Sequence, residues 1–495
     1  MEVRRKKAVF CILLLASFAY IWYCNAVMTE VPHLSWFDQL PIADAWFQGR
    51  LTWKDLISSY HSGEHGMFAN HVLYLLNVIW FQGCTKFDVY LNDLNVVVTG
   101  AICMVLSYRM LKQMKSCLFY LAAEALFLFS FVQGSSGAME TQVRLGILSF
   151  LITMIFVDRE LRECATQSRK HLYAALLLIA LSILVFGTLY SFAGVPLVWL
   201  LVLITYRRDS KGQKRKLAVA AVYALSVPVY LAEYRIFGFM QDAVQERAGV
   251  MQNLGYALAH PVNTLKCLLA WYANGVMGWA YHESGKYTPA GWMLFGVLAC
   301  TFLVFAVVLF FRCRMYERTW LPLMCIVYSF GVFWLVLLGR ETQWEWFSSE
   351  WYSVHMKIAY AGAVWIIGYV SGRQKGIWKK LVCTGSVLLL CVCSCMGNYE
   401  AVKRAPYVHL YYKNMQKYLF VEDERLMPVD AAGNTPLLDT LDRTMDAIAV
   451  LKKYRLSVYK YWDAYENCPG NADKGLGRER DESSNIGRRV RNQNQ

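Results

Sequence analysis

Two aspartates, a glutamate and two histidines lie close together in the first long polar stretch of the chain, residues 35–70. They are Asp38, Asp44, His61, Glu64 and His65. An ionised aspartate accepts a proton from an alcohol that is held within hydrogen-bond distance. The other side chains can contact a phosphate, a sugar hydroxyl or a metal ion. We therefore predict that this stretch carries a functional site.

Each of these residues also has a structural interpretation. Asp44 suits the N-cap or first turn of a helix, and Asp38 suits a turn before Pro41. The spacing of His61, Glu64 and His65 matches the H-x-x-E-H pattern of one class of zinc peptidase, but that pattern needs a helix. Ser62 and Gly63 weaken a helix at this point, so we favour either a ligand-binding turn or a solvated one.

Two arginines are candidates for holding a phosphate group. Arg340 directly follows an apolar run, and Arg144 lies near the start of another. A guanidinium at the membrane surface can bind a lipid phosphate through two parallel hydrogen bonds. Extension of the side chain toward water at a helix end is the alternative. Glu124 lies within a third apolar run, where an acid is costly and indicates either function or a partner on a neighbouring helix.

The remainder of the chain reads as membrane helix. Of its 495 residues, 57% are hydrophobic and 17% are charged, whereas soluble proteins carry about 25% charge. Apolar runs recur with the length of membrane spans. The net charge of +14 arises from Lys and Arg between these runs, which topology explains better than nucleic-acid binding does. Most of the 15 cysteines lie inside apolar runs, so no disulfide framework is predicted.

The distribution of basic residues predicts the topology. Arg4, Arg5, Lys6 and Lys7 precede the apolar run 8–27, as in an uncleaved signal anchor that enters from the cytoplasm. Every second loop after that is basic, which places these loops in the cytoplasm. Segments 45–60 and 70–81 are helical in pattern but short, and are expected to lie along the outer membrane surface. The further spans are predicted at 90–111, 118–132, 143–157, 172–190, 192–206, 218–236, 292–311, 320–338, 354–370 and 381–396.

The predicted fold is thus an all-α polytopic membrane protein with about eleven spans. Residues 1–396 form the membrane module, with external loops at 28–89 and 237–291, the latter partly helical at 241–256. Residues 397–469 form an external helical region. Residues 470–495 lack apolar content and are expected to be disordered.

Several short motifs resemble those of bacterial membrane glycosyltransferases of the GT-C type. The loop reads as D-x-W-x-x-G at 44–49, L-x-W-x-D-L at 51–56 and H-x-x-E-H at 61–65. Further similar stretches are YSFAGVPLVWL at 190–200, LGRETQWEWFSSEWY at 338–352 and LKKYRLSVY at 451–459. The sequence departs from the family pattern at Gly63 and Gly66, which stand where the family has Asn and Arg.

The resemblance implies a GT-C-like fold and transfer of a sugar from a polyprenyl-phosphate donor to a glycan or lipid-linked acceptor outside a bacterial plasma membrane. Asp44 would be the base of an inverting displacement, with Asp38 and Glu64 as further acids. The implied substrate-binding residues are His61, His65, Arg144, Arg340 and Trp46. Arg340, Arg144 or a divalent cation such as Mg²⁺ or Mn²⁺ would offset charge on the leaving phosphate. No nucleic-acid partner is expected.

Two other function classes fit the same sequence. A transporter or flippase of lipid-linked glycans would need no catalysis, and it would carry charged residues along a path through its spans. A membrane scaffold would make the external acids dispensable.

Overall fold

The computed structural model describes most of the chain, including nearly all of the apolar runs. The described residues are 2–29, 40–57, 68–131, 141–163, 169–186, 189–208, 212–237, 250–286, 288–339, 344–349, 352–421, 449–456 and 459. Almost all of them are helical, and none forms a strand. The prediction of an all-α fold is confirmed.

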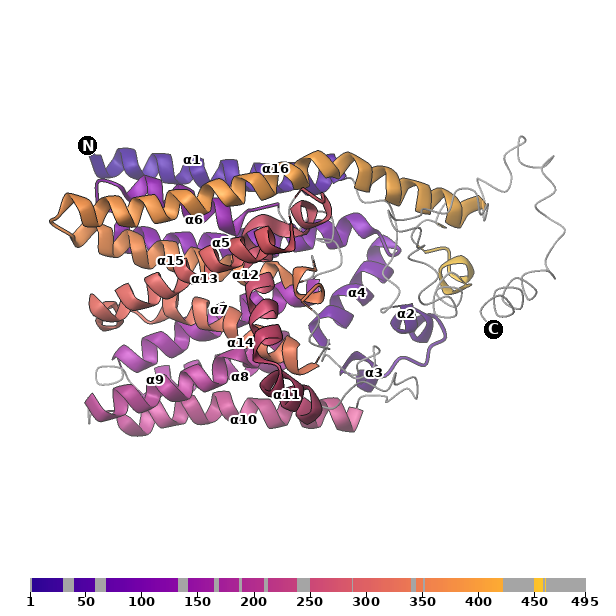
Figure 1. The fold of residues 1–495 in the computed structure, drawn as a ribbon. Helices are drawn as coiled ribbons and strands as arrows, with labels where there is room; N and C mark the ends of the chain where they lie inside the picture. Colours follow the sequence, from indigo (N-terminus) through magenta and orange to yellow (C-terminus); the bar gives the residue numbers. More distant parts are fainter. Residues whose placement is uncertain are drawn as a thin grey trace.

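The helices form a bundle that is roughly parallel to one axis (Figure 1). In chain order they are α1 (Glu2–Trp22), α2 (Leu40–Phe47), α3 (Trp53–Ile57), α4 (Phe68–Phe81), α5 (Thr85–Leu111), α6 (Cys117–Leu128), α7 (Thr141–Glu163), α8 (Arg169–Phe186), α9 (Val195–Arg208), α10 (Gln213–Phe237), α11 (Val250–Ala259), α12 (Pro261–Glu283), α13 (Pro289–Arg312), α14 (Leu321–Gly339), α15 (Val354–Arg373) and α16 (Ile377–Val421). A π-helical segment, η1 (Tyr23–Thr29), follows α1, and a 3-10 turn, η4 (Leu189–Gly194), precedes α9.

Six of the described helices are long and apolar enough to cross a membrane. They include 4–25, 86–111, 169–186, 289–312, 321–339 and 377–407. Apolar side chains such as Leu15, Leu177, Val304 and Leu389 are exposed on the outside of these helices. Exposure of large aliphatic side chains along a bundle is costly in water and favourable against lipid. The protein is therefore a multi-pass membrane protein.

The two ends of the bundle differ in charge. The N-terminus, the α5–α6 connection, the α13–α14 connection and the α15–α16 connection share one end, which we call the basic end (Figure 1). The ammonium of Lys6 donates to Met114 O there at 3.2 Å. Helices α2, α3 and α4 cluster at the opposite end, which we call the α2–α4 end.

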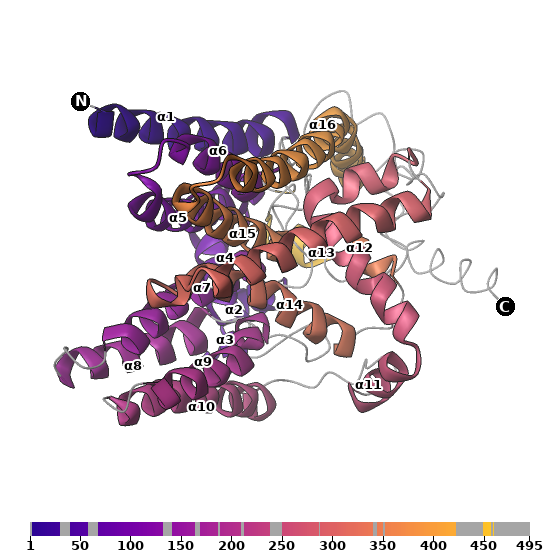
Figure 2. The ribbon, with the colours of Figure 1, turned by 60° about the vertical axis from the view of Figure 1, so that its left-hand side comes forward.

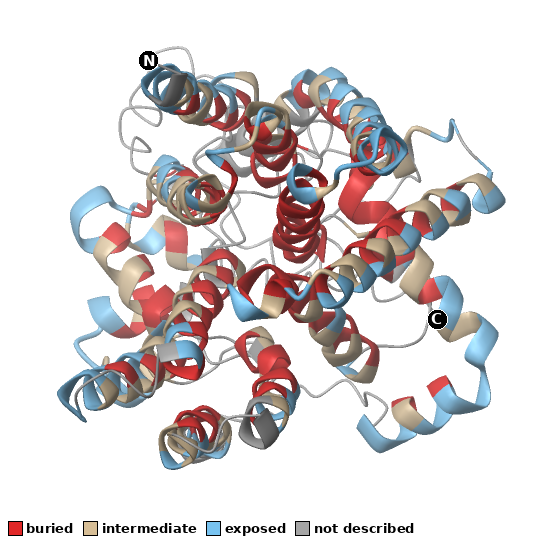
Figure 3. Cartoon of the chain, turned by 90° about the vertical axis from the view of Figure 1, so that its left-hand side faces the viewer, coloured by how far each residue is buried: buried red, intermediate tan, exposed pale blue. Residues whose placement is uncertain are grey.

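Helix α15 occupies the centre of the bundle. Every residue from Val354 to Ser371 is buried, and the helix is seen end-on as the red helix near the middle of Figure 3. Helices α6, α13, α14 and α16 pack around it. On one side, α8, α9 and α10 form a separate group that α7 joins to the remainder (Figure 2).

Glycines allow helices to approach closely around α12. A Cβ atom on Gly296 of α13 would lie 2.2 Å from Leu269 O of α12. A Cβ atom on Gly397 of α16 would lie 2.1 Å from Met277 O. Neither position has room for a side chain, as in other tightly packed membrane helices.

Three expectations about element bounds were wrong. Segment 45–60 is not one helix, because the chain turns after Phe47 through Gly49, whose φ of 68° suits glycine. The span expected to end at 396 continues to Val421 as one helix. The loop 237–291 contains more helix than 241–256, since α12 packs in the core with Trp271 fully buried.

Helix α12 was missed because polar residues lower its hydropathy. One of them, Asn274, is fully buried. Its amide nitrogen donates to Ser349 O at 2.6 Å and to Phe347 O at 3.4 Å. The amide nitrogen is thus satisfied, whereas Oδ1 has no hydrogen-bond partner among the described residues. The sequence alone does not reveal the partners of the nitrogen.

Candidate functional site

The structure describes three of the eight residues that the sequence analysis put forward. These are Asp44, Trp46 and Arg144. The other five lie outside the described residues: Asp38, His61, Glu64, His65 and Arg340.

Asp44 projects from α2 and is held by side chains that follow it in the chain. The amide of Gln48 donates to both carboxylate oxygens at 2.9 Å. The guanidinium of Arg50 lies 2.9 Å from Oδ2. Asp44 is the fifth residue of α2 rather than its N-cap, so its carboxylate is available for contacts outside the helix backbone.

A segment from the far end of the chain completes the surroundings of Asp44. The hydroxyl of Tyr454 donates to Asp44 Oδ1 at 3.0 Å, and the ammonium of Lys453 lies 3.8 Å from the same oxygen. The ring of Tyr454 stacks on Phe47, with centroids 4.4 Å apart. Residues 449–456 therefore lie against α2, although more than 400 positions separate Tyr454 from Asp44.

The carboxylate is fixed but still reachable from solvent. The side chain of Asp44 is 18% exposed. Gln48, Arg50 and Tyr454 together make four hydrogen bonds to its two oxygens, which is about the number that a carboxylate accepts. An incoming hydroxyl would have to displace one of these donors. Trp46, two residues along, is 42% exposed and offers an aromatic face at the same end of the bundle.

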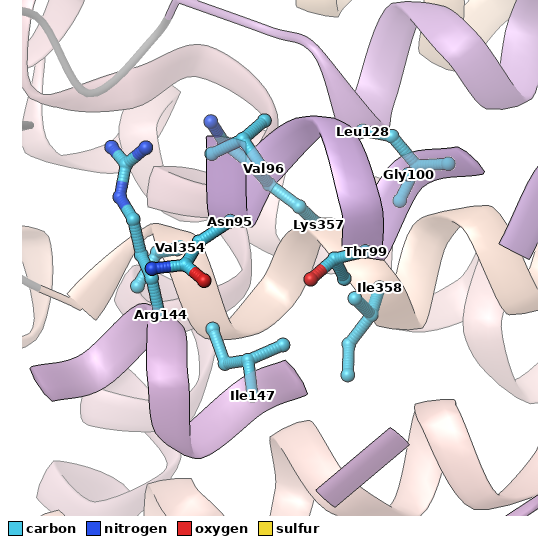
Figure 4. Close-up of a pocket in the computed structure, with 10 residues that line it drawn as sticks. All are labelled: Asn95, Val96, Thr99, Gly100, Leu128, Arg144, Ile147, Val354, Lys357 and Ile358. Atoms are coloured by element: carbon cyan, nitrogen blue, oxygen red, sulfur yellow. The ribbon is translucent and has the colours of Figure 1, made fainter. Parts of the chain in front are cut away.

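Arg144 lines a pocket inside the bundle, among α5, α6, α7 and α15. The cavity volume of this pocket is about 30 Å³, which is room for about two water molecules and less than a small-molecule ligand needs. Its polar side chains come from Asn95 and Thr99 of α5, Arg144 of α7 and Lys357 of α15. In Figure 4 the ends of Arg144 and Lys357 extend toward the same side of the pocket.

Both cations of this pocket are buried. Arg144 is 5% exposed and donates to Asn92 O at 3.5 Å. Lys357 is 5% exposed and donates to Ser130 O at 2.7 Å. Burial of an ammonium or a guanidinium in a membrane bundle is expensive and marks a functional position. The remaining lining is apolar and includes Val96, Ile147 and Ile358.

An acid lies beside the pocket. Asp93 of α5 is 6% exposed, and its Oδ1 accepts from the amide of Asn25 in η1 at 2.5 Å. The positive charge of Arg144 acts on this carboxylate. Its second oxygen, Oδ2, has no hydrogen-bond partner among the described residues.

Asp93, Asn95 and Lys357 were not predicted as functional residues. The first two fell within the span predicted at 90–111, and Lys357 fell within that at 354–370. Asp93 and Lys357 share with Glu124 the signal of a charged side chain inside an apolar run, whereas the uncharged Asn95 gives no such signal. Glu124 itself accepts from Ser107 at 2.5 Å, so it has the partner on a neighbouring helix that the sequence analysis gave as one alternative.

Asp44 and the pocket are separate features, since Asp44 does not line it. Helices α7 and α15 contribute residues of their first turns to the pocket and α5 contributes residues from its middle. All three helices begin toward the α2–α4 end (Figure 1). A pocket of about 300 Å³ near the basic end is lined by Arg312, Lys379 and mostly apolar side chains. Within the described part of the chain, no three His, Cys, Asp or Glu side chains cluster as metal ligands do.

Searches with protein-family models, curated proteins and solved structures find no match to this chain.

Proposed function

We propose that the protein is a membrane glycosyltransferase that moves a sugar from a polyprenyl-phosphate donor to a glycan or lipid-linked acceptor. The observation that supports this most is the pocket of Arg144 and Lys357, which lies inside a membrane bundle and toward the end where Asp44 is exposed. Two buried cations line that pocket among apolar side chains, and guanidinium and ammonium groups are the usual donors to phosphate oxygens. The GT-C-type motifs of the loop point to the same class of enzyme.

In this proposal the acceptor hydroxyl approaches the anomeric carbon opposite the phosphate. Asp44 takes the hydroxyl proton as the new carbon–oxygen bond forms and the bond from carbon to the phosphate oxygen breaks. The lipid leaves as a phosphomonoester, and the configuration at the anomeric carbon inverts. One carboxylate suffices as base, whereas a double displacement with retention uses two carboxyl groups about 5 Å apart.

The remaining features of the proposal come from the sequence. The GT-C fold, the eleven spans, a cytoplasmic N-terminus and an external C-terminal region belong to it, as does a bacterial plasma membrane. Asp38 and Glu64 are further acids of the site. His61, His65, Arg340 and Trp46 are substrate contacts. The α2–α4 end would then face the outside, and the basic end would face the cytoplasm.

A flippase of lipid-linked glycans is the alternative. It is favoured by the charged side chains that the structure buries inside the bundle, among them Asp93, Glu124, Arg144 and Lys357. Such groups can line a path for a lipid headgroup. A flippase would use the pocket but not the base.

Substitution of Asp44 by Asn separates the two functions. We expect turnover of a polyprenyl-phosphate sugar in membranes to fall at least about 100-fold, because a general base contributes about 10²–10⁴-fold. The matched control is Asp55→Asn in α3, whose carboxylate accepts from Thr52 N and Oγ1. The control should retain turnover. Equal turnover of wild type and Asp44→Asn at equal expression would remove Asp44 from the mechanism. Transbilayer movement of the lipid without any turnover would favour the flippase.

A further inference from the structure

The pocket of about 300 Å³ near the basic end is built where three helices end or begin. Its lining comes from the last two turns of α13, the end of α15 and the first two turns of α16. The candidate span 289–312 ends at this pocket, and the candidate span 377–407 begins there. A site at the ends of spans lies at the depth of the lipid headgroups. It is at the opposite end of the bundle from Asp44 and is therefore not part of the proposed sugar-transfer site.

Two cations from different helices line this pocket. Arg312 is the last residue of α13, and Lys379 lies in the first turn of α16. Both are exposed, and neither side chain has a hydrogen-bond or ion-pair partner among the described residues. The segment 373–380 holds four basic residues and no acid. The edge of the pocket therefore has a positive charge that an anion from outside the protein would complement.

Most of the remaining wall is apolar and is open to the outside of the bundle. Val382 is 59% exposed and Trp378 is 77% exposed. Phe305 and Leu309 of α13 form the opposite part of the wall. Exposed apolar side chains on membrane helices face lipid, and tryptophan is typical of the boundary between the membrane and water. The pocket thus combines an apolar wall for a hydrocarbon chain with two cations for an anionic headgroup.

This combination distinguishes between classes of ligand. A soluble anion would contact the cations but would leave the apolar wall uncovered. A zwitterionic lipid such as phosphatidylethanolamine has a phosphodiester and acyl chains, but its ammonium group would meet the basic segment 373–380. An anionic lipid such as phosphatidylglycerol has the same phosphodiester and the same chains without that ammonium. Basic pockets between membrane helices are suited to anionic lipid headgroups.

We propose that this pocket binds one anionic glycerophospholipid from the leaflet at the basic end. Arg312 and Lys379 donate to its phosphate, and one of its acyl chains lies against the apolar wall that includes Val382. The bound lipid joins the end of α13 to the start of α16. The proposal does not rest on sugar transfer, because an enzyme and a flippase could both carry such a lipid.

A titration with two lipids tests the proposal. Purified full-length protein in a non-ionic detergent is titrated with phosphatidylglycerol and, separately, with phosphatidylethanolamine that has the same acyl chains, and native mass spectrometry measures the bound lipid. Wild type should bind phosphatidylglycerol at least about tenfold more tightly, because a hydrogen bond between charged groups contributes about tenfold or more. The double variant Arg312→Gln, Lys379→Gln should lose at least this factor. Both side chains are exposed, so the variant should fold.

Two further variants separate the pocket from the basic surface around it. The matched control is Arg318→Gln, Lys380→Gln, which removes the same charge at the same end from residues that do not line the pocket. Its affinity for phosphatidylglycerol should change less than threefold. Val382→Trp keeps every charge but fills the apolar wall. It should weaken binding at least about tenfold, since each CH₂ group that leaves water contributes about fourfold.

Four results would overturn the proposal. Equal affinity of wild type for the two lipids would do so without any variant. Equal losses in the two double variants would show attraction to a basic surface instead of a site. Unchanged binding in Val382→Trp would show that the acyl chain does not lie in the pocket. Competition by glycerophosphoglycerol, which has the headgroup but no acyl chains, at the affinity of the intact lipid would show that the ligand is a soluble anion.

Discussion

Removal of the Tyr454 hydroxyl should loosen the C-terminal segment from α2. In Tyr454→Phe the ring can still stack on Phe47, so the change isolates the hydrogen bond to Asp44. A hydrogen bond to a charged group contributes about 1.5–3 kcal/mol. Because Asp44 is partly exposed, we take the lower value, about 1.5 kcal/mol. Tyr454→Ala also loses the stacked pair, which contributes about 1 kcal/mol more.

Hydrogen exchange measures this loosening directly. The amide of Tyr454 donates to Val450 O at 3.1 Å, and that of Leu456 donates to Leu451 O at 2.9 Å. Both amides should exchange when the segment opens locally. Since 1.4 kcal/mol corresponds to tenfold, we expect about tenfold faster exchange in Tyr454→Phe and about fiftyfold or more in Tyr454→Ala.

A double-mutant cycle with Asp44→Ala is the decisive control. If Tyr454 acts through Asp44, Tyr454→Phe should have almost no further effect once the carboxylate is absent. Exchange that accelerates less than twofold in Tyr454→Phe would refute the hydrogen bond as a tether. An equal acceleration in the presence and absence of the carboxylate would refute the pairing with Asp44.

Two other predictions concern packing and pH. Gly397→Ala should destabilise the protein by about 2 kcal/mol or more in thermal unfolding, because the new methyl group meets the backbone at Met277; Gly385→Ala on the same helix has open space and should be neutral or slightly stabilising. Equal melting temperatures for the two variants would contradict the close approach of α12 and α16. Burial lowers the pKa of His71 to about 4, with its Nδ1 3.0 Å from Leu56 O. The folded state therefore holds His71 neutral, and its contribution to the free energy of unfolding is intact above about pH 6.5. As the pH falls toward 4, protonation of His71 in the unfolded state lowers the free energy of unfolding, by about 2 kcal/mol at pH 5. His71→Gln should flatten that part of the stability–pH curve, and an unchanged slope between pH 6.5 and 5 would contradict the burial.

The helices of the bundle were predictable from the sequence where a long apolar run marks a helix that lies in the lipid bilayer. Helix α13 was expected at 292–311 and runs from 289 to 312, because its sequence is almost uninterrupted apolar. Helix α12 could not be recognised in this way, since polar residues interrupt its sequence and the amide nitrogen of Asn274 finds its partners on η6 (Trp346–Ser348) and at Ser349. Partners across the fold are not visible in one sequence.

The candidate site, too, was predictable from the sequence only in part. Asp44 was found because an acid in a polar loop after the first span is a simple pattern. Its contact with Tyr454 depends on the chain returning to α2 after the whole bundle has formed. The pocket was missed for a related reason: Arg144 was recognised at a helix end, but Lys357 comes from the central helix, and only the packing of α5 against both α7 and α15 brings them to one pocket.

The proposed chemistry is tested most directly with purified protein in nanodiscs, supplied with a radiolabelled polyprenyl-phosphate hexose and an acceptor glycan. The measurement is the rate at which label passes to the acceptor, together with binding of the donor. Wild type should transfer label, and Asp44→Asn should bind the donor within threefold of wild type but transfer it at least about 100-fold more slowly. Transfer by Asp44→Asn at the wild-type rate, or no transfer by wild type that binds the donor, would contradict the mechanism.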